Sequence, residues 1–328
     1  MKIINKVNYL ILLFALSLFA LSFSATAQTY PTRPIRFIIP FPAGSSSNDI
    51  LGRALAQKLT DVLGQQVVVD NRSGASGHIG AEIVVRAPPD GYTLLLGVNG
   101  TLAIGPSVFS KLPYDPVRDL APVARFVTIP YAIAIHPSVP ANNIKEFIAY
   151  AKTQPDKLHF SSSGSGGTPH LCGELLKTMA GIDMVHVPYK GGAPAMVDLL
   201  GGQVQLYCSG ITATLPHAKG GRLRLIAATT LKRSAVAPDV PTAHESGLAG
   251  FDVASWISIM APAKTPRPIV QRLYDAIVKV TNEPTMRNSI IAQGAEPALQ
   301  TPEEFGVYLK DEIAKWAKVV KSAKVKVD

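Results

Sequence analysis

The sequence predicts an α/β protein of two lobes, each built on a doubly wound, mostly parallel sheet. Short apolar runs, rich enough in β-branched residues to be buried strands, alternate with longer segments whose apolar residues recur at helical spacing. This alternation is typical of parallel sheets with helices on both faces. The chain has 328 residues, and the 328 − 27 = 301 residues left after a predicted signal peptide are enough for two such lobes.

The first 27 residues have the three parts of a secretory signal peptide. Lys2 and Lys6 precede an apolar run from Tyr9 to Phe23, and the small residues around Ala27 close it. A membrane anchor is the alternative, but this run of 15 residues is shorter than the roughly 20 residues of a membrane span. We therefore expect an exported protein that is cleaved after Ala27.

The net charge gives little support to a nucleic-acid partner. The whole chain carries a formal charge of +9, and removing two lysines with the signal peptide leaves +9 − 2 = +7. Nucleic-acid binding needs clustered basic residues, whereas here they are scattered, apart from a tail between Lys315 and Lys326 that is typical of a solvated helix face. We expect no nucleic-acid partner and a mild general attraction for anions.

A polar loop between a strand and a helix is the first candidate site. The apolar run from Ile35 to Phe41 predicts a strand, residues 42–49 form a turn, and Leu51, Leu55 and Leu59 follow at helical spacing. The first N–H groups of a helix lack partners and carry partial positive charge, so such a loop can bind a carboxylate or a phosphate. One of these residues is also expected simply to cap the helix. The loop lacks the Lys-Ser/Thr pair of a Walker A motif.

The next loops follow the same pattern. Tyr92 to Gly97 predicts another buried strand, whose loop should lie beside the first because the carboxyl ends of parallel strands share one edge of a sheet. In that loop Asn99 and Thr101 either contact a ligand or only tie the loop down.

A second polar loop, residues 161–170, has the same character. Here Thr168 is predicted to be the N-cap and Pro169 the first helical residue. The loop has neither a complete dinucleotide fingerprint nor the Gly-x-Ser-x-Gly of a nucleophile elbow. Two such helix ends facing each other would clamp an anion.

The chain changes lobes twice. Two apolar runs after Leu120 indicate a crossing, and residues 251–262 indicate the return. We expect residues 28–127 with 255–328 in lobe 1 and 128–254 in lobe 2, with hinges near Phe126 to Pro130 and Ala254 to Pro262. Helices are predicted from Ile269 to Asn282 and from Glu303 to Lys321.

The two cysteines allow two interpretations. Cys172 and Cys208 could pair in an oxidising compartment, but their separation in sequence cannot place them within bonding range. Two buried free thiols are the simpler expectation. No Cys/His spacing resembles a zinc site, and we predict no metal, cofactor or catalytic residue.

An ordered series of motifs carries a family resemblance over essentially the whole mature chain. The chain resembles the Bug family, the periplasmic receptors of tripartite tricarboxylate transporters, in the following motifs: Tyr30-Pro31, Pro42-Ala43-Gly44 with Asp49 and Arg53, Asn71-Arg72-x-Gly74, Pro89 to Leu94, Leu112 to Pro116, His136-Pro137-Ser138, Gly167 to Leu171, Val187 to Gly191 and Asp239 to Thr242.

The resemblance implies a two-lobed Venus-flytrap fold that closes on a small carboxylate, partly through ordered waters. It places the carboxylate at the loops Ala43 to Asp49 and Ser163 to His170, the same two loops found above. The expected ligand-binding residues are Phe41, Ala43, Ser45, Ser46, Ser47, Asn48, Asp49, Asn99, Thr101, Ser163, Gly166, Thr168, His170 and Cys208. We expect a monomeric periplasmic receptor that delivers its ligand to the membrane subunits of a transporter.

The chain departs from the commoner family pattern at three places. Ser45 to Asn48 replaces a Gly-Gly-Ser/Thr pattern, Cys172 replaces a small alanine, and Cys208-Ser209 replaces an acidic or amide residue. The last change argues against an amino acid, whose ammonium group needs a carboxylate. We expect a dicarboxylate, and favour an aromatic one such as terephthalate. A sensor that signals to a membrane kinase and, less readily, a hydrolase that uses the serine-rich loop with His170 are the alternatives.

Overall fold

The computed structural model describes residues 30–44, 47–323 and 325. The predicted signal peptide, Ser45 and Ser46 lie outside the described residues. The chain divides into two compact units, residues 1–32 and 33–328, and everything described below belongs to the second. No helix among the described residues has both the length and the apolar character needed to cross a membrane.

The predicted alternation of strands and helices is present. The strands are β1 (Ile35–Ile39), β2 (Val67–Asn71), β3 (Thr93–Val98), β4 (Leu120–Ile135), β5 (His159–Ser162), β6 (Val185–Pro188), β7 (Leu206–Gly210), β8 (Arg224–Ala228), β9 (Ala254–Pro262) and β10 (Glu296–Gln300). The α-helices are α2 (Ser47–Leu63), α3 (His78–Val85), α4 (Gly105–Val108), α5 (Ile144–Lys152), α6 (Thr168–Ala180), α7 (Gly192–Leu200), α8 (Ile211–Lys219), α9 (Arg267–Thr281), α10 (Pro284–Ala292) and α11 (Pro302–Ser322). Two short helical turns are η1 (Ala75–Gly77) and the π-helical η2 (Gly100–Ile104).

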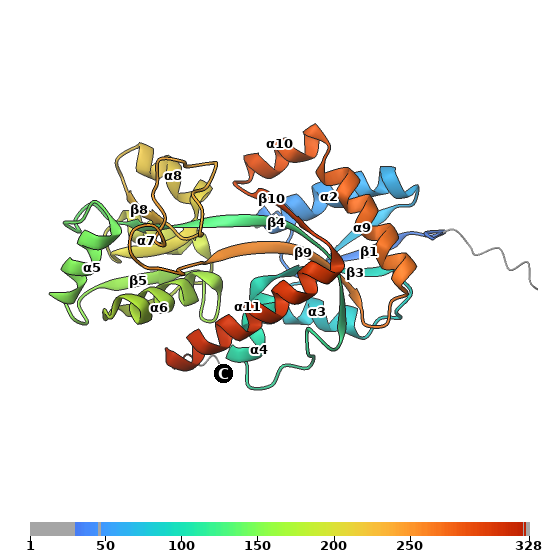
Figure 1. The fold of residues 1–328 in the computed structure, drawn as a ribbon, viewed down its shortest axis with the longest axis horizontal. Coiled ribbons are helices and arrows are strands. Elements are labelled where there is room, and N and C mark those ends of the chain that lie inside the picture. The colour runs from blue at the N-terminus through green and yellow to red at the C-terminus, as the bar shows by residue number, and fades with distance from the viewer. Residues whose placement is uncertain (1–29, 45–46, 324, 326–328) are drawn as a thin grey trace, which may run out of the picture. The chain divides into compact units, whose positions relative to one another are not determined.

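The strands join in the order β2-β1-β3-β9-β4-β7-β5-β6, with β8 and β10 also paired to β4. At one end β1 is parallel to β2 and β3, and at the other β5 is parallel to β6 and β7. Between these parallel groups, β4 and β9 run antiparallel to each other and connect the two groups, as Figure 1 shows. The predicted α/β fold class with two sheet groups is therefore confirmed, and the connecting strands are antiparallel.

The predicted crossings form one two-stranded ladder. Thr128 pairs with Trp256 and Pro130 pairs with Ala254, so both segments expected to be hinges lie on neighbouring strands. β4 is long because its first part pairs with β9 and β10 and its last part pairs with β7 and β8.

Two C-terminal elements escape sequence-based prediction, namely α10 and β10. The helix α10 buries only Met286 and Ile290 and leaves Ile291 57% exposed, so its apolar stripe is weak. The strand β10 pairs with β4 alone, and its burial pattern lacks the strict alternation that marks a half-buried strand.

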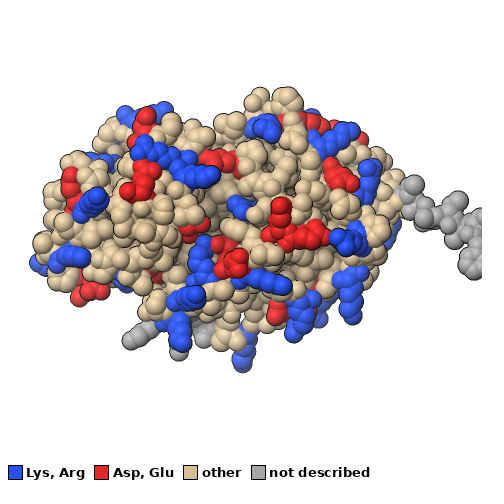
Figure 2. All heavy atoms as spheres, viewed as in Figure 1, with Lys and Arg blue, Asp and Glu red and all other residues tan. Residues whose placement is uncertain are grey.

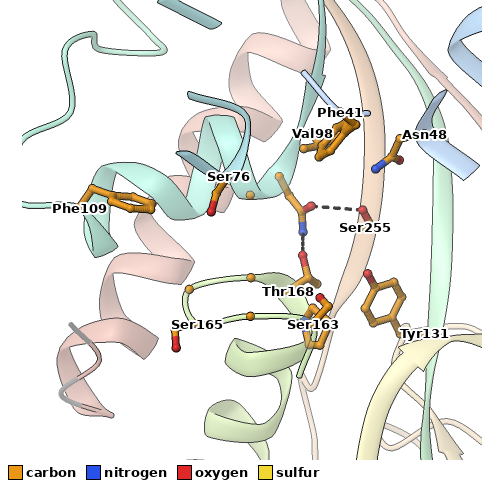
Figure 3. Close-up of a pocket in the computed structure, with 16 residues that line it drawn as sticks. Phe41, Asn48, Ser76, Val98, Phe109, Tyr131, Ser163, Ser165, Thr168 and Ser255 are labelled. Atoms are coloured by element: carbon orange, nitrogen blue, oxygen red, sulfur yellow. Dashed lines mark hydrogen bonds between the residues drawn. The ribbon is translucent and has the colours of Figure 1, made fainter. Parts of the chain in front are cut away.

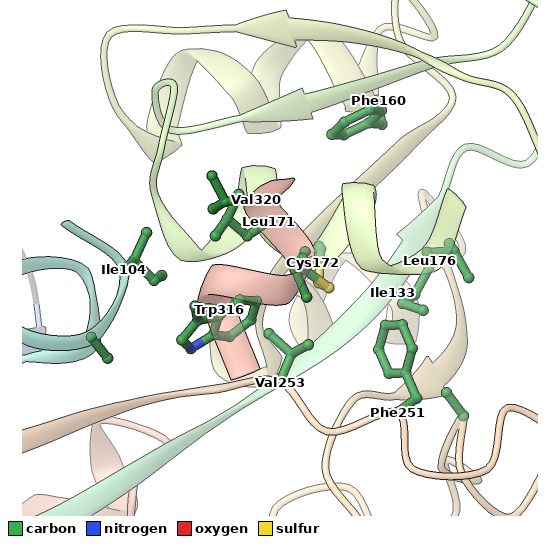
Figure 4. Packing of buried hydrophobic residues seen from close by; sticks show 14 of the residues in the cluster. Ile104, Ile133, Phe160, Leu171, Cys172, Leu176, Phe251, Val253, Trp316 and Val320 are labelled. Carbon is green, nitrogen blue, oxygen red and sulfur yellow. A yellow bond between two sulfur atoms is a disulfide. The ribbon is translucent and has the colours of Figure 1, made fainter. Parts of the chain in front are cut away.

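The helix α11 packs against elements at both ends of the sheet. Its start is fixed by a capping box in which Thr301 and Glu304 satisfy each other's backbone N–H groups. Its buried Trp316 and Val320 belong to the same core cluster as Leu171 and Cys172 of α6 and Ile104 of η2. Figure 4 shows these side chains together. One continuous core therefore joins the C-terminal helix to both sheet groups.

The expectation of two free thiols is wrong. Cys172 of α6 and Cys208 of β7 form a disulfide, with their Cα atoms 6.2 Å apart. Because α6 packs across β7, the fold brings together two residues that are 36 positions apart in sequence. Both side chains are buried in the core.

We expect that replacing both cysteines, in Cys172→Ala with Cys208→Ala, lowers the free energy of unfolding by about 3 to 4 kcal/mol. This is the loop-closure entropy that a cross-link spanning about 36 residues removes from the unfolded chain. Urea unfolding of the oxidised wild type and the double variant measures it. Equal midpoints, or two titratable thiols in the denatured wild type, would contradict the disulfide.

Candidate ligand-binding site

A pocket of about 260 Å³ lies between the two sheet groups. Its volume is just below the roughly 300 Å³ at which typical small-molecule pockets begin, so it suits a small ligand. The lining consists of Phe41, Asn48, Ser76, Val98, Asn99, Gly100, Phe109, Tyr131, Ser163, Gly164, Ser165, Gly166, Gly167, Thr168, Pro169 and Ser255. Figure 3 shows these residues arriving from loops of both groups and from the connecting strands.

The N-terminus of α6 opens into this pocket without a side-chain cap. The N-cap is Gly167, in an extended conformation, and it has no side chain that could accept a hydrogen bond from the first turn. The prediction that Thr168 is the N-cap and Pro169 the first helical residue is wrong by one position. Thr168 is already helical, and its hydroxyl accepts a hydrogen bond from Asn99 instead of capping the helix. Pro169 has no N–H, so the backbone donors that this helix end can offer to the pocket are the N–H groups of Gly167 and Thr168, which lack a partner from their own helix.

The loop before α6 is shaped by glycines and by groups behind it. Gly164 and Gly166 have φ values of +139° and +76°, a backbone region that residues with a Cβ atom rarely adopt. The Gly166 N–H donates to His170 Nδ1 at 3.0 Å, and the Gly164 N–H donates to Ser162 Oγ at 3.2 Å. Gly166 lines the pocket, but its N–H is already used, and His170 supports the loop from behind rather than lining the pocket.

Two stacked histidines form that support. The rings of His170 and His186 are 3.7 Å apart and nearly parallel, and Phe160 stacks on His186. Burial, assisted by the charge of Lys177, lowers the pKa of His170 to about 4. Burial, assisted by His170 and Lys177, lowers the pKa of His186 to about 3. Both rings are therefore neutral near pH 7, which lets His170 Nδ1 accept from Gly166.

The loop after β1 is held by Asp49. This carboxylate is fully buried and accepts hydrogen bonds from the Gly44 N–H, Asn71 Nδ2 and Arg53 Nε at 2.7 to 2.9 Å. Burial acts to raise the pKa of Asp49, but the bonds from Arg53, Gly44 and Asn71 outweigh it, and the pKa is lowered. Asp49 is therefore an ionised anchor for the loop and does not line the pocket.

The other residues expected in this loop are divided. Phe41 and Asn48 line the pocket, whereas Ala43 and Ser47 do not. Ser45 and Ser46 lie outside the described residues. The side-chain carbonyl oxygen of Asn48 is buried and has no hydrogen-bond partner within the described part of the chain.

The remaining expected residues are also divided. Ser163, Thr168 and Asn99 line the pocket. Thr101 is fully buried in η2, next to Ser76, and does not line it. The sequence predicts a ligand contact at Cys208, and the structure instead places this residue in the core disulfide, away from the lining.

Tyr131 and Ser255, on the connecting strands, escaped prediction. Tyr131 is half-buried on β4, and Ser255 of β9 donates to Asn99 Oδ1 at 3.3 Å. Burial, together with the nearby Tyr207, raises the pKa of Tyr131, so its phenol stays protonated, while the hydroxyls of Ser255 and Thr168 act in the opposite direction. The alternation of side chains along β4 and β9 could have indicated that Tyr131 and Ser255 face inward. It could not have indicated that the two strands meet at one pocket.

No side chain in this lining is charged. The pocket offers hydroxyl groups, the side-chain amide of Asn48, backbone N–H groups and the apolar faces of Phe41, Val98 and Phe109. This combination can hold an anion by hydrogen bonding without an ion pair.

Two α/β groups connected by two strands, with a polar pocket between them, are the architecture of the periplasmic-binding-protein fold. Residues 51–325 match the model of the tripartite tricarboxylate transporter family receptor, TctC. The chain belongs to this family of solute-binding receptors, which includes the Bug proteins.

Solved structures agree with this assignment. An R. palustris protein with adipate is 36% identical, with a TM-score of 0.80, over 91% of this chain and 100% of that chain. The periplasmic binding protein BugD is 38% identical, with a TM-score of 0.76, over 91% and 100%. MatC from Rhodopseudomonas palustris with bound malate is 31% identical, with a TM-score of 0.75, over 89% and 100%.

We expect His186→Phe to make the protein less sensitive to acid. His170 and His186 have folded-state pKa values of about 4 and 3, below the ordinary 6.5, so the unfolded chain binds more protons between these limits. Stability contributed by the neutral rings is therefore complete above pH 6.5 and is lost as the pH falls toward 3. Phenylalanine keeps a stacking ring without a titrating group, and Ser162 keeps its bonds with Gly164.

The measurement is the free energy of unfolding against pH. The wild-type slope below pH 6.5 should exceed that of the variant by at most about 1.4 kcal/mol per pH unit, the value for one proton. Identical slopes would mean that His186 titrates in the folded protein as it does in the unfolded chain, and would contradict the lowered pKa.

Proposed function

We propose that this receptor captures a small dicarboxylate in its pocket and delivers it to the membrane subunits of a tripartite transporter. The observation that carries the proposal is the uncapped N-terminus of α6 at the pocket. A carboxylate there would accept hydrogen bonds from the Gly167 and Thr168 N–H groups and from the Thr168 hydroxyl, and would interact favourably with the helix dipole. The carboxylates bound by two relatives, adipate and malate, support the same ligand class.

The lining favours a dicarboxylate over an amino acid. No carboxylate lines the pocket to receive an ammonium group, and a buried unpaired ammonium is unfavourable. Phe41, Val98 and Phe109 provide apolar walls for the body of the ligand, and Asn48 and Tyr131 offer donors for a second carboxylate. An aromatic diacid such as terephthalate remains the favoured form. Four charge-assisted hydrogen bonds at about 3 kcal/mol each give about 12 kcal/mol, which leaves the roughly 8 kcal/mol of micromolar binding after about 4 kcal/mol of association cost.

Closure of two lobes around the ligand is part of this proposal. We place lobe 1 at residues 28–127 with 255–328 and lobe 2 at 128–254, so the division falls where Thr128 pairs with Trp256. Export to the periplasm with cleavage after Ala27 and a monomeric receptor complete the proposal. On the face drawn in Figure 2, basic side chains lie among acidic ones, which favours a small-molecule receptor over a nucleic-acid binder.

We infer a role without catalysis. Ser162 and His186 are 2.7 Å apart, but Ser162 Oγ is buried behind the loop and also bonds to Gly164, so it is poorly placed to attack a ligand. His170 is likewise engaged with Gly166. A sensor that passes the closed state to a membrane kinase would use the same pocket, and a pull-down of membrane partners would separate it from a transport receptor.

Gly167→Asp tests the anion site directly. A Cβ at Gly167 would meet no atom closer than 3.6 Å, and its φ of −83° suits any residue, so a side chain can be added. Aspartate is a favoured N-cap and would place an internal carboxylate on the α6 N-terminus. We expect carboxylate binding to fall by about 100-fold or more, the loss of two charge-assisted hydrogen bonds at about 1.5 kcal/mol each.

The probes are adipate, malate and terephthalate, measured by thermal shift and calorimetry. A probe at about 100 times its dissociation constant should stabilise the wild type by about 2.7 kcal/mol. Gly167→Ala is the matched control, and should bind like the wild type. The carboxylate site would be refuted if the wild type bound none of the three probes. It would also be refuted if Gly167→Asp bound a probe as tightly as the wild type.

A further inference from the structure

The side-chain amide of Asn99 joins three elements at the pocket. Its Nδ2 donates to Thr168 Oγ1 at 2.9 Å and to the Ala254 carbonyl at 3.1 Å, and its Oδ1 accepts from Ser255 Oγ at 3.3 Å. Figure 3 shows the bonds to Thr168 and Ser255 side by side. Asn99 is 1% exposed although it lies at the pocket wall, so its amide is almost entirely shielded from bulk water.

The orientation of this amide is fixed by chemistry. A backbone carbonyl can only accept a hydrogen bond, so the atom of Asn99 that faces Ala254 must be the nitrogen. The same nitrogen faces Thr168, and it can only donate. Thr168 Oγ1 is therefore the acceptor in this bond, whichever way its own hydrogen points.

The direction of the bond determines what Thr168 offers to a ligand. A hydroxyl has one hydrogen, and since Thr168 accepts from Asn99, that hydrogen remains for an acceptor on the pocket side. Without ligand, the phenol oxygen of the neighbouring Tyr131 is an available acceptor. An ionised carboxylate accepts more strongly than a neutral oxygen and would take its place.

We propose that Asn99 is a positioning residue that makes the Thr168 hydroxyl a dedicated hydrogen-bond donor to the ligand carboxylate. This inference rests on the proposed carboxylate function of the same pocket. Asn99 itself has no hydrogen-bonding capacity left on its nitrogen, so it acts on the ligand through Thr168. Asn99 bonds to Ala254 and Ser255 of β9 and to Thr168 of α6. The direction in which the Thr168 hydroxyl donates therefore depends on contact between these elements of the two sheet groups.

The test is a double-mutant cycle. Asn99→Asp has nearly the same shape but presents only acceptors to Thr168, so the hydroxyl hydrogen turns toward the introduced carboxylate and lone pairs face the ligand. Thr168→Val removes the hydroxyl and keeps the shape. Each single variant should weaken binding of the tightest of adipate, malate and terephthalate by about 10- to 100-fold, the range for one hydrogen bond to a charged group.

The cycle separates the proposed role from charge repulsion. Repulsion between the introduced carboxylate and the ligand persists in the Thr168→Val background, whereas an effect transmitted through Thr168 disappears there. We expect Asn99→Asp to weaken binding at least about fivefold less in the Thr168→Val background than in the wild type. This difference corresponds to a coupling free energy of about 1 kcal/mol. Thr168→Ser, which keeps the hydroxyl, should restore near-wild-type binding and the full sensitivity to Asn99→Asp.

Two further measurements keep the outcome unambiguous. If Asn99→Asp does not fold, Asn99→Ala takes its place in the cycle with a smaller expected loss and a coupling of the same sign, because the Thr168 hydroxyl then loses its fixed orientation without being reversed. Suppose that the wild type binds one of the three probes and that Gly167→Asp abolishes this binding. If the effects of the Asn99 and Thr168 substitutions then simply add, the role of Asn99 is overturned and the proposed function stands. A wild type that binds none of them overturns the proposed function and this inference with it.

Discussion

The antiparallel ladder between β4 and β9 holds the two groups of parallel strands in one sheet, and the pocket depends on it. The ladder extends from the pair of Leu120 with Pro262 to the pair of Pro130 with Ala254. Tyr131 and Ser255 lie where it ends, so their side chains reach the pocket only in this register. A slip of one residue would turn either strand's inward side chains to the opposite face. The same ladder carries the Ala254 carbonyl that orients Asn99.

The C-terminal helix α11 constrains this ladder from one side. Glu312, which is buried, accepts hydrogen bonds from Trp256 of β9 and from Trp316 of its own helix, and it pairs with Lys315. Lys315 in turn donates to the Asp252 carbonyl just before β9. Since α11 also packs on α6, a change in the angle between the two strand groups must move this helix relative to at least one of its neighbours. The lobe closure proposed above would therefore act on this buried polar network at the strands that connect the two groups.

The pocket would hold the proposed anion with neutral groups, and this has a physical advantage for a receptor that must also exist empty. A buried arginine or lysine would be desolvated and unpaired whenever the ligand leaves, which is costly. Helix N–H groups, hydroxyls and amides lose less on burial, and water can replace the ligand at them. The charged residues near the site, Asp49 and Arg53, are instead paired with each other and hold the loop.

The sequence by itself determined the α/β class, the alternation of strands and helices and the two polar loops at helix N-termini, because these depend on local periodicity and turn composition. Its candidates include six residues that line the pocket, namely Phe41, Asn48, Asn99, Ser163, Gly166 and Thr168. Tertiary structure alone decided the rest. Pairing of Cys172 with Cys208 depends on how α6 packs across β7, and the contributions of Tyr131 and Ser255 depend on the register of distant strands. Asp49 and His170 have side chains that suit a ligand, but their roles as loop supports follow from partners that only the fold brings within reach.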